Sequence, residues 1–465
     1  MEPDRIRFGG GTADTILHPF FAVAMVLAII LILCLPRKYV VVPLLFGTFT
    51  IPLGQVVVLA GIHFTVLRIL ILAGLLRWAV SQRPSADGTF TGGFNPVDRV
   101  TVLWTSMTFV IFSIQWMESQ AFIRSLGDLL DKLGGYLVVR FLIQDTEDIK
   151  RVLKVFAAIC VLMSICMINE QITQRNIFGL LGGTGLVPQI RDGKVRSQGA
   201  FGVYIDAGVF AGTLIPLFIW LWAGAKSRLA AGLGILGATA MTVTSNASTS
   251  QLAYVSGLVA LCFWPLRNRM RQFRWGLVIV LTALHLVMKA PVWALIARID
   301  LTGSSSGYHR YQLVDNCIRH FTDWWLLGTK VYDSWGWDMW DLSNQFVACA
   351  FTGGLVVMAL FIAILSRSFG AIGKARKLVE GNRAEEWYLW YLGAALFATV
   401  VAFFGCSYMA QMQMEFFALL SMISVATFEA MKFVPTMATA TVTVTPRLNH
   451  VSKAMRTRNP VEETK

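Results

Sequence analysis

Apolar residues recur along this chain in runs whose length matches the hydrocarbon core of a membrane. A spanning helix needs about 20 mostly apolar residues, and lipid-exposed backbone has to satisfy its own hydrogen bonds, as a helix does. We therefore predict an all-α, polytopic membrane protein with about 12–13 transmembrane helices. The apolar runs lie at residues 17–35, 39–52, 64–80, 98–117, 125–143, 152–170, 205–224, 229–244, 251–266, 275–290, 344–366, 388–410 and 414–431.

The composition supports a membrane protein over a soluble one. Hydrophobic residues make up 55% of the 465 residues and charged residues 14%, and the mean hydropathy is +0.61, whereas about a quarter of the residues in soluble domains are charged. The formal net charge is +13, but Lys and Arg fall in short segments between the apolar runs. There they act as topology signals and contact anionic membrane lipids. We expect no nucleic-acid partner.

The basic clusters fall on alternate connections, which predicts an orientation. Since cytoplasmic connections are enriched in Lys and Arg, these connections face the cytoplasm and the N-terminus faces outward. We predict a transmembrane domain over residues 1–431 and a basic, disordered cytoplasmic tail over 432–465. Two long connections, about 171–204 and 291–343, then lie on the outer face. Long connections without repeats are often functional.

Both outer connections carry cations, contrary to the usual charge rule. These residues are Arg175, Arg191, Lys194, Arg196, Arg310 and Arg319. A guanidinium binds phosphate oxygens through two parallel hydrogen bonds, so a lipid diphosphate at the outer leaflet would explain them. Pairing with Asp192, Asp300 or Asp315 would explain some of them equally well.

Ionisable residues also occur at membrane depth, where they form ion pairs or line a polar cavity. These residues are Arg68, Arg124, Asp128, Asp131, Arg140, Glu170, Asp206 and Glu415. The chain has no phosphate loop, no H-E-x-x-H, no G-x-S-x-G and no C-x-x-C motif, which excludes hydrolysis-driven transport within this chain. We expect metal-independent chemistry without a cofactor.

Five short segments, in three regions of the chain, resemble one known family. The matching segments are E-Q-I-T-Q-R-N-I-F at 170–178, R-D-G-K-V-R-S-Q-G-A-F at 191–201, G-Y-H-R at 307–310, D-W-W-L-L-G-T-K at 323–330, and D-L-S-N-Q-F at 341–346 followed by T-G-G-L. On these segments the chain resembles the bacterial O-antigen polymerase and O-antigen ligase superfamily, in the branch associated with exopolysaccharide assembly. Glu170 and Asn344 belong to the matched motifs.

The resemblance implies a glycosyltransferase of the bacterial inner membrane. Such enzymes move a glycan from a polyprenyl diphosphate to a sugar hydroxyl at the periplasmic face, and outer-face arginines hold the diphosphate. Arg196 and Arg310 match the arginine positions of the family, and Arg191 and Arg319 are weaker candidates for the same role. Chain-length regulators and export proteins are the implied protein partners.

The sequence departs from the family at the base that activates the acceptor. Where the ligases have His-Asn at the start of the helix after the second loop, this chain has Ser343 and Asn344. A serine hydroxyl is a poor base, so the candidates are Asp341 first, then His320 and His309. A carboxylate acting opposite the leaving group would give inversion at the anomeric carbon.

Two functional hypotheses follow. The first is polymerisation or transfer of lipid-linked repeat units, and the altered histidine favours polymerisation. The second is a transporter or flippase for a lipid-linked glycan, with Arg68, Asp128, Glu170 and Glu415 along its path. Bond formation by the purified protein without any gradient would distinguish the first from the second.

Overall fold

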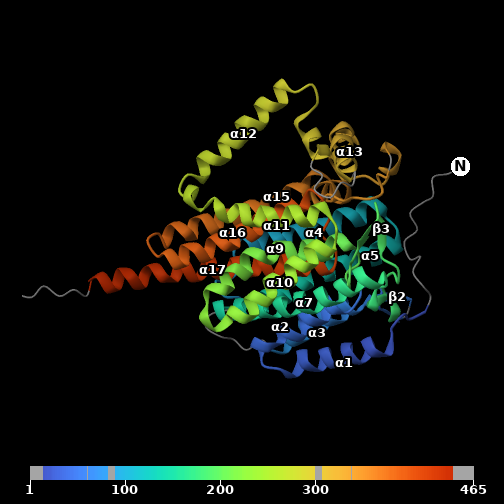
Figure 1. Ribbon diagram of the computed structural model, residues 1–465, viewed down its shortest axis with the longest axis horizontal. Helices are drawn as coiled ribbons and strands as arrows, with labels where there is room; N and C mark the ends of the chain where they lie inside the picture. The colour runs from blue at the N-terminus through green and yellow to red at the C-terminus, as the bar shows by residue number, and fades with distance from the viewer. Residues whose placement is uncertain (1–13, 60, 82–88, 299–305, 337, 443–465) are drawn as a thin grey trace, which may run out of the picture.

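The computed structural model describes residues 14–59, 61–81, 89–298, 306–336 and 338–442, and every apolar run predicted from the sequence contains helix there (Figure 1). The first helices are α1 (Pro19–Cys34), α2 (Arg37–Thr50), α3 (Val66–Val80), α4 (Pro96–Trp116), α5 (Ser119–Leu129), α6 (Gly135–Leu142), α7 (Thr146–Thr173), α8 (Ile177–Leu180) and α9 (Tyr204–Ala223). The remaining helices are α10 (Arg228–Thr244), α11 (Ser248–Cys262), α12 (Met270–Val287), α13 (Ser306–Arg319), α14 (Phe321–Trp324), α15 (Gln345–Leu378), α16 (Arg383–Phe403) and α17 (Gln411–Val442). The protein is mainly helical, as predicted.

Several of these helices are suited to crossing a membrane. Within the described residues, α4, α7, α9, α15, α16 and α17 are long and apolar enough to span, and α12 joins them if it counts together with the 3₁₀-helix η4 (Val292–Arg298), which it meets at 91°. The chain is therefore a multi-pass membrane protein. Helix α1 has 16 residues, about 24 Å of rise, against a core of about 30 Å. The count of 12–13 crossings stays a prediction.

The core lies around α9 and α17. In the 18-residue apolar stretches of these helices, 72% and 83% of the residues are buried, against 39% in that of α4. A helix that is apolar all round belongs inside a bundle, and α9 fits this description because its buried residues follow one another from Ala207 to Phe218. Peripheral helices leave apolar side chains at the surface, as α1 does with Phe20 and Val23. In a membrane these side chains would face lipid.

Three local features depart from a plain set of helices. The segment predicted as one span at 125–143 is α5 and α6 joined by the π-helix η1 (Leu130–Gly134). Two antiparallel hairpins also form, β1 (Val56–Leu59) with β2 (Ile62–Thr65) and β3 (Gln189–Arg191) with β4 (Lys194–Arg196). The all-α prediction holds for the membrane helices but did not include these hairpins.

The helix ends separate into two groups. At one end lie the N-termini of α4, α7, α10 and α16 and the C-termini of α9, α11 and α15, together with the described basic clusters of the sequence. We call this the basic end. At the other, the loop end, lie both hairpins and α13, next to the N-termini of α9, α11 and α15 (Figure 1). Both predicted outer connections therefore lie at the loop end. Residues 443–465, most of the predicted tail, fall outside the described residues, and α17 continues beyond residue 431.

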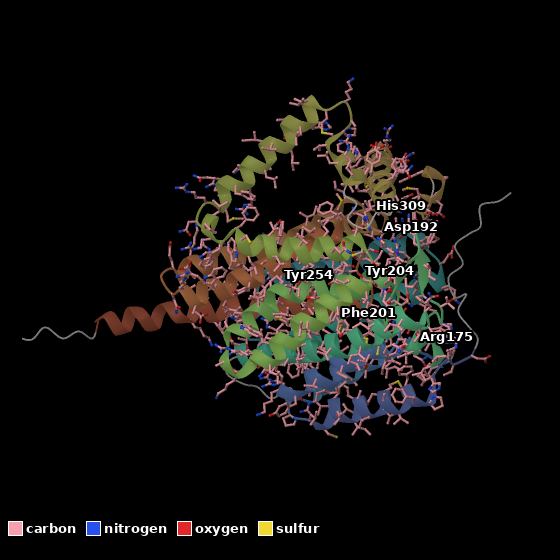
Figure 2. The ribbon with its side chains drawn as sticks, in the orientation of Figure 1. Arg175, Asp192, Phe201, Tyr204, Tyr254 and His309 are labelled. Atoms are coloured by element: carbon pink, nitrogen blue, oxygen red, sulfur yellow. The ribbon has the colours of Figure 1, made fainter. Side chains whose placement is uncertain are left out.

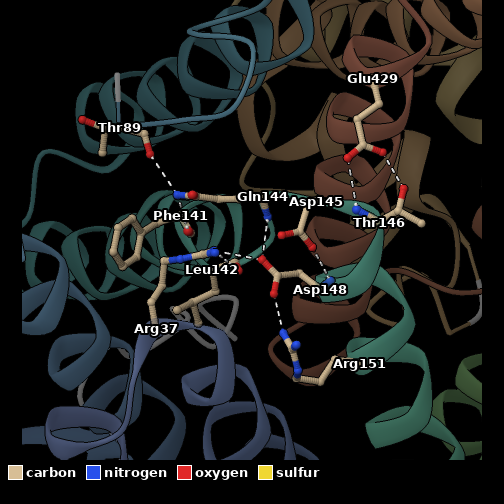
Figure 3. A network of polar contacts seen from close by, with 10 residues as sticks. All are labelled: Arg37, Thr89, Phe141, Leu142, Gln144, Asp145, Thr146, Asp148, Arg151 and Glu429. Atoms are coloured by element: carbon tan, nitrogen blue, oxygen red, sulfur yellow. Dashed lines mark hydrogen bonds and ion pairs between the residues drawn. The ribbon is translucent and has the colours of Figure 1, made fainter. Parts of the chain in front are cut away.

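Charges at the basic end are held in networks with carboxylates (Figure 3). The Asp148 carboxylate accepts a hydrogen bond from Arg37 at 2.9 Å and pairs with Arg151 one turn along α7. Beside it, Glu429 of α17 accepts hydrogen bonds from the backbone N–H and the hydroxyl of Thr146. These contacts tie α2, α7 and α17 together.

The long connection before α15 is fastened to a break in that helix. Gly353 and Gly354 have non-helical backbone angles, and the freed groups find partners in the connection. The N–H of Thr329 donates to the carbonyl of Phe351 at 2.9 Å, and the N–H of Leu355 donates to the carbonyl of Trp325 at 2.8 Å. The break in α15 therefore holds the long connection at the loop end.

Candidate functional site

Arg196 is placed by the β3–β4 hairpin. Asp192 and Gly193 at its turn both have positive φ, 51° and 71°, the geometry of a type I′ turn, for which Asp-Gly is a preferred sequence. The hairpin ends at Arg196, which is 4% exposed. Its Nη1 donates to the Tyr204 hydroxyl at 2.6 Å, and its guanidinium lies over the Tyr204 ring, 4.7 Å from the centroid.

The segment next to Arg196 is fixed to the α10–α11 connection. The N–H of Ser197 donates to the carbonyl of Thr244 at 3.1 Å, and the side chain of Asn246 donates to the carbonyl of Val195 at 2.7 Å. Glu170 holds the same segment from α7, because its carboxylate accepts the N–H groups of Gln198 and Gly199 at 3.1 and 3.0 Å. Glu170 is thus a structural anchor for the segment that follows Arg196.

Arg310 reaches the same connection from the other long loop. It lies in α13, is 9% exposed, and its Nη2 donates to the Thr249 hydroxyl at 2.7 Å. That hydroxyl in turn donates to the carbonyl of Gly405 at 3.4 Å. Thr249 lies in the first turn of α11, directly after the connection that binds the backbone of Val195 and Ser197. The two segments that carry these buried arginines therefore both contact the region where α11 begins. Guanidinium groups are suited to binding phosphate oxygens.

His309 and Asp341 come together beside Arg310. The Nε2 of His309 lies 3.0 Å from the carbonyl oxygen of Asp341 and 3.9 Å from its carboxylate. A carbonyl only accepts, so Nε2 carries a proton, and in the neutral imidazole the lone pair is then on Nδ1. Nδ1 is buried, with no hydrogen-bond partner among the described residues. The Asp341 side chain is half exposed. Figure 2 places His309, Asp192 and Tyr204 at the loop end.

The other predicted residues lie farther from this pair of arginines. Arg319 is nine residues after Arg310 in α13, about 14 Å along the helix; it is exposed and bonds Asp315 at 2.6 Å. His320 stacks on Trp335, with 4.2 Å between ring centroids, and lies 3.0 Å from a carboxylate oxygen of Asp323. These two residues lie away from Arg196 and Arg310.

The structure gives local positions to Arg191 and Asn344. Arg191 lies beside the hairpin turn, 3.9 Å from the Asp192 carboxylate, at the far end of the hairpin from Arg196. Asn344 is buried, and its side-chain oxygen accepts the N–H groups of Phe346 and Val347 at 3.0 and 3.2 Å. Asn344 is therefore the N-cap of α15. Ser343 precedes it directly.

Other side chains of the long connection are weaker candidates for a nucleophile or a metal ligand. Burial raises the pKa of the Cys317 thiol to about 12, so this group stays a protonated, weak nucleophile. Among the described residues no group of three or more His, Cys, Asp and Glu side chains gathers as metal ligands would. The described side chains of this part of the chain that suit substrate chemistry are guanidinium groups, which bind anions, and His and Asp side chains, which transfer protons.

The two buried arginines and His309 were among the residues predicted from the sequence for the site, whereas Thr249 and the hairpin were not. The Asp-Gly pair inside R-D-G-K was a signal for the hairpin; nothing in the sequence pointed to Thr249, which meets Arg310 across 61 positions. No protein-family model and no curated protein sequence matches the chain. The geometry therefore has to carry the functional argument alone.

Proposed function

We propose that the chain is a glycosyltransferase of the bacterial inner membrane that polymerises or transfers polyprenyl-diphosphate-linked oligosaccharides at the periplasmic face. The observation that carries this proposal is the placement of Arg196 and Arg310. Both are buried at the loop end of a multi-pass membrane protein. Asn246, in the turn between α10 and α11, binds the residue before Arg196, and Thr249, in the first turn of α11, binds Arg310 itself. Burial strengthens the interaction of a guanidinium with an anion.

A diphosphate is already a competent leaving group, so the protein has two tasks. Arg196 and Arg310 would neutralise the negative charge that grows on the diphosphate as the glycosidic bond breaks. A base would remove the proton from the attacking sugar hydroxyl. The attack on the face opposite the diphosphate gives inversion at the anomeric carbon.

The geometry favours His309 as that base over His320. His309 is next to Arg310 in the chain, and its Nδ1 lone pair has no hydrogen-bond donor among the described residues. Asp341 lies beside it and is the second candidate. His320 belongs to a separate cluster with Trp335 and Asp323. The replacement His309→Asn should remove transfer, whereas His320→Asn should leave most of it; equal losses in both would contradict this choice.

The direct test is a transfer assay with the purified protein. The chain, reconstituted in nanodiscs without any gradient, should convert a lipid-linked oligosaccharide into a ladder of longer products. Arg310→Ala should abolish the ladder, and Arg228→Ala, an exposed arginine at the basic end, should not. An unchanged ladder from Arg310→Ala would refute the assigned role.

A transporter or flippase is the second candidate function, and one observation favours it. Glu415, in the membrane-spanning helix α17, is 4% exposed, and its Oε2 has no hydrogen-bond partner among the described residues. Its other oxygen accepts the Thr213 hydroxyl. Buried carboxylates at membrane depth often mark ion or proton paths. Movement of a labelled lipid-linked glycan across vesicles, without any bond formation, would support this alternative.

A further inference from the structure

A cavity lies away from the two arginines, between helices near the N-terminal third of the chain. It has a volume of about 650 Å³ and is partly open at the surface, a size typical of ligand pockets. It lies between the β2–α3 region and the α5–η1–α6 segment. Its lining residues are Gly61, Ile62, His63, Phe64, Arg68, Leu75, Gln120, Ile123, Arg124, Leu126, Gly127, Leu129, Leu130, Leu133, Gly134 and Leu137. We call it the α3–α5 cavity.

The lining of the α3–α5 cavity is amphipathic along its length. Arg124, Gln120 and His63 lie at the loop end of the helices, whereas Leu130, Leu133 and Leu137 extend toward the middle of the bundle. From residue 124 to 137 a helix rises about 20 Å, comparable with the hydrocarbon depth of about 15 Å in one leaflet. A polar head with a single-leaflet apolar chain matches this shape.

The two arginines of the cavity, Arg68 and Arg124, differ in their exposure to solvent. Arg68 bonds the Asp131 carboxylate through Nε at 3.0 Å and donates to the carbonyl of His63 at 3.2 Å. Its guanidinium also packs on Gly127, where a Cβ would approach the central carbon of that group to 2.8 Å. The Arg68 side chain is therefore held in one position at the side of the cavity. Arg124 is exposed and lies in the second turn of α5, toward the loop end.

Neighbouring side chains make the opening face the membrane. Ile123 and Leu126, on either side of Arg124, are 40% and 51% exposed. Exposed apolar residues on a membrane helix face lipid, so a lipid molecule can enter from the side. Within the described residues, α3 and α5 do not pack closely on α9, α11 or α13, the helices around Arg196 and Arg310. The α3–α5 cavity is therefore a second, separate site.

We infer that the α3–α5 cavity binds one anionic phospholipid, with its phosphate at Arg124 and an acyl chain along Leu130 and Leu133. The positive charge of Arg124 complements the phosphate, and the apolar wall complements the chain. The depth of one leaflet fits an acyl chain, which a polyprenyl chain would exceed several-fold. This inference does not depend on the proposed glycosyltransferase activity.

Native mass spectrometry of the delipidated protein tests the site. Titration with dioleoylphosphatidylglycerol should show one tight equivalent, and dioleoylphosphatidylcholine should bind more weakly. Arg124→Gln should weaken that equivalent about fivefold, the effect of about one interfacial cation. Leu130→Trp, which fills the apolar part, should weaken it about tenfold, as expected for about two excluded methylene groups.

Two matched variants control for general changes in lipid binding. Arg228→Gln removes an exposed arginine, and Leu236→Trp enlarges an exposed leucine, both on α10 and outside the cavity; both should bind as the unaltered chain does. If Leu130→Trp fails to fold, the exposed Arg124 variant still tests the site.

Three results would overturn the inference. The first is equal binding by Arg124→Gln and the unaltered chain. The second is equal affinity for the phosphatidylglycerol and the phosphatidylcholine, which would remove the role of head-group charge. The third is displacement of the phosphatidylglycerol by undecaprenyl phosphate at equal concentration, which would identify a polyprenyl carrier as the occupant.

Discussion

The two ends of the helix bundle both bury arginines but hold them with different partners. At the basic end, Arg140 bonds the Asp98 carboxylate at 3.2 Å, and Arg376 lies 3.5 Å from the Glu386 carboxylate. At the loop end, Arg196 contacts the hydroxyl and ring of Tyr204, and Arg310 contacts the hydroxyl of Thr249.

This difference distinguishes arginines that stabilise helix packing from arginines that we propose bind substrate. A buried ion pair cancels its own charge and fixes two helices against each other, and removing one partner leaves a costly buried charge. At the loop end the hydroxyls of Tyr204 and Thr249 orient the two guanidinium groups, which we propose bind the diphosphate of the substrate. Substitutions at the basic end should therefore change stability, whereas substitutions of the loop-end arginines should change activity in a protein that still folds.

The largest effect is expected from Asp98→Ala at the basic end. This replacement leaves Arg140, which is fully buried, without its carboxylate, and it also removes the acceptor of the Tyr136 hydroxyl. The expected loss is about 3–5 kcal/mol of stability, measured by thermal unfolding in detergent. Glu147→Ala is the control, because its pair with Lys150 is exposed and contributes at most about 1 kcal/mol. Similar losses in both variants would mean that burial of the pair has no special role.

A smaller effect, on activity, is expected from Arg196→Ala. Removing one buried donor to a developing anion typically costs about 10²–10³ in rate, so the initial rate of ladder formation should fall by this factor while the melting temperature changes little. Arg196→Lys should recover part of the rate, because it keeps the charge but not the two parallel hydrogen bonds. Arg319→Ala should stay within about twofold, since its ion pair is exposed. Collapse of the fold in Arg196→Ala would assign this arginine to packing.

The helices could be predicted well because one physical requirement governs all of them: backbone N–H and C=O groups in lipid have to form hydrogen bonds within the protein. The sequence predicted the small irregular elements poorly. The π-helix η1 and the break at Gly353 and Gly354 leave no mark on hydropathy, and the hairpins are too short for a period of two to stand out. The break depends on a hydrogen bond that the carbonyl of Trp325 accepts and one that the N–H of Thr329 donates, both in a distant loop.

The site residues chosen from the sequence stay predictions, and the structure shows only how close together their segments lie. Arg196 and Arg310 were chosen as outer-face cations, and the segments that carry them both contact the region where α11 begins. Arg319 was chosen for the same reason, but its position along α13 separates it from them. The pairing of His309 with Asp341 spans 32 positions, and no local pattern could have predicted it.

The attachment of the long connection to α15 at the loop end can be tested at Gly328. Its φ is +79°, and a Cβ there would lie 2.1 Å from the carbonyl oxygen of Phe351. Gly328→Ala should therefore loosen the long connection from α15 and cost about 1–3 kcal/mol, seen as a lower melting temperature and faster proteolysis within residues 306–336. Gly370→Ala, at an open position, is the matched control. Unchanged proteolysis would show that the connection has other, sufficient anchors.

The smallest effect is expected from Asn344→Ala, and it distinguishes a structural from a catalytic reading of the D-L-S-N-Q-F motif. The Asn344 side chain is buried and caps α15 through Phe346 and Val347, so its loss should cost about 1 kcal/mol and leave the rate per folded molecule nearly unchanged. Asn344→Asp should restore the stability, because a carboxylate also accepts these N–H groups. If Asn344→Ala instead lowers the rate as much as Arg196→Ala does, this residue contacts substrate. The buried polar residues of the loop end would then include both residues that stabilise the fold and residues that bind substrate.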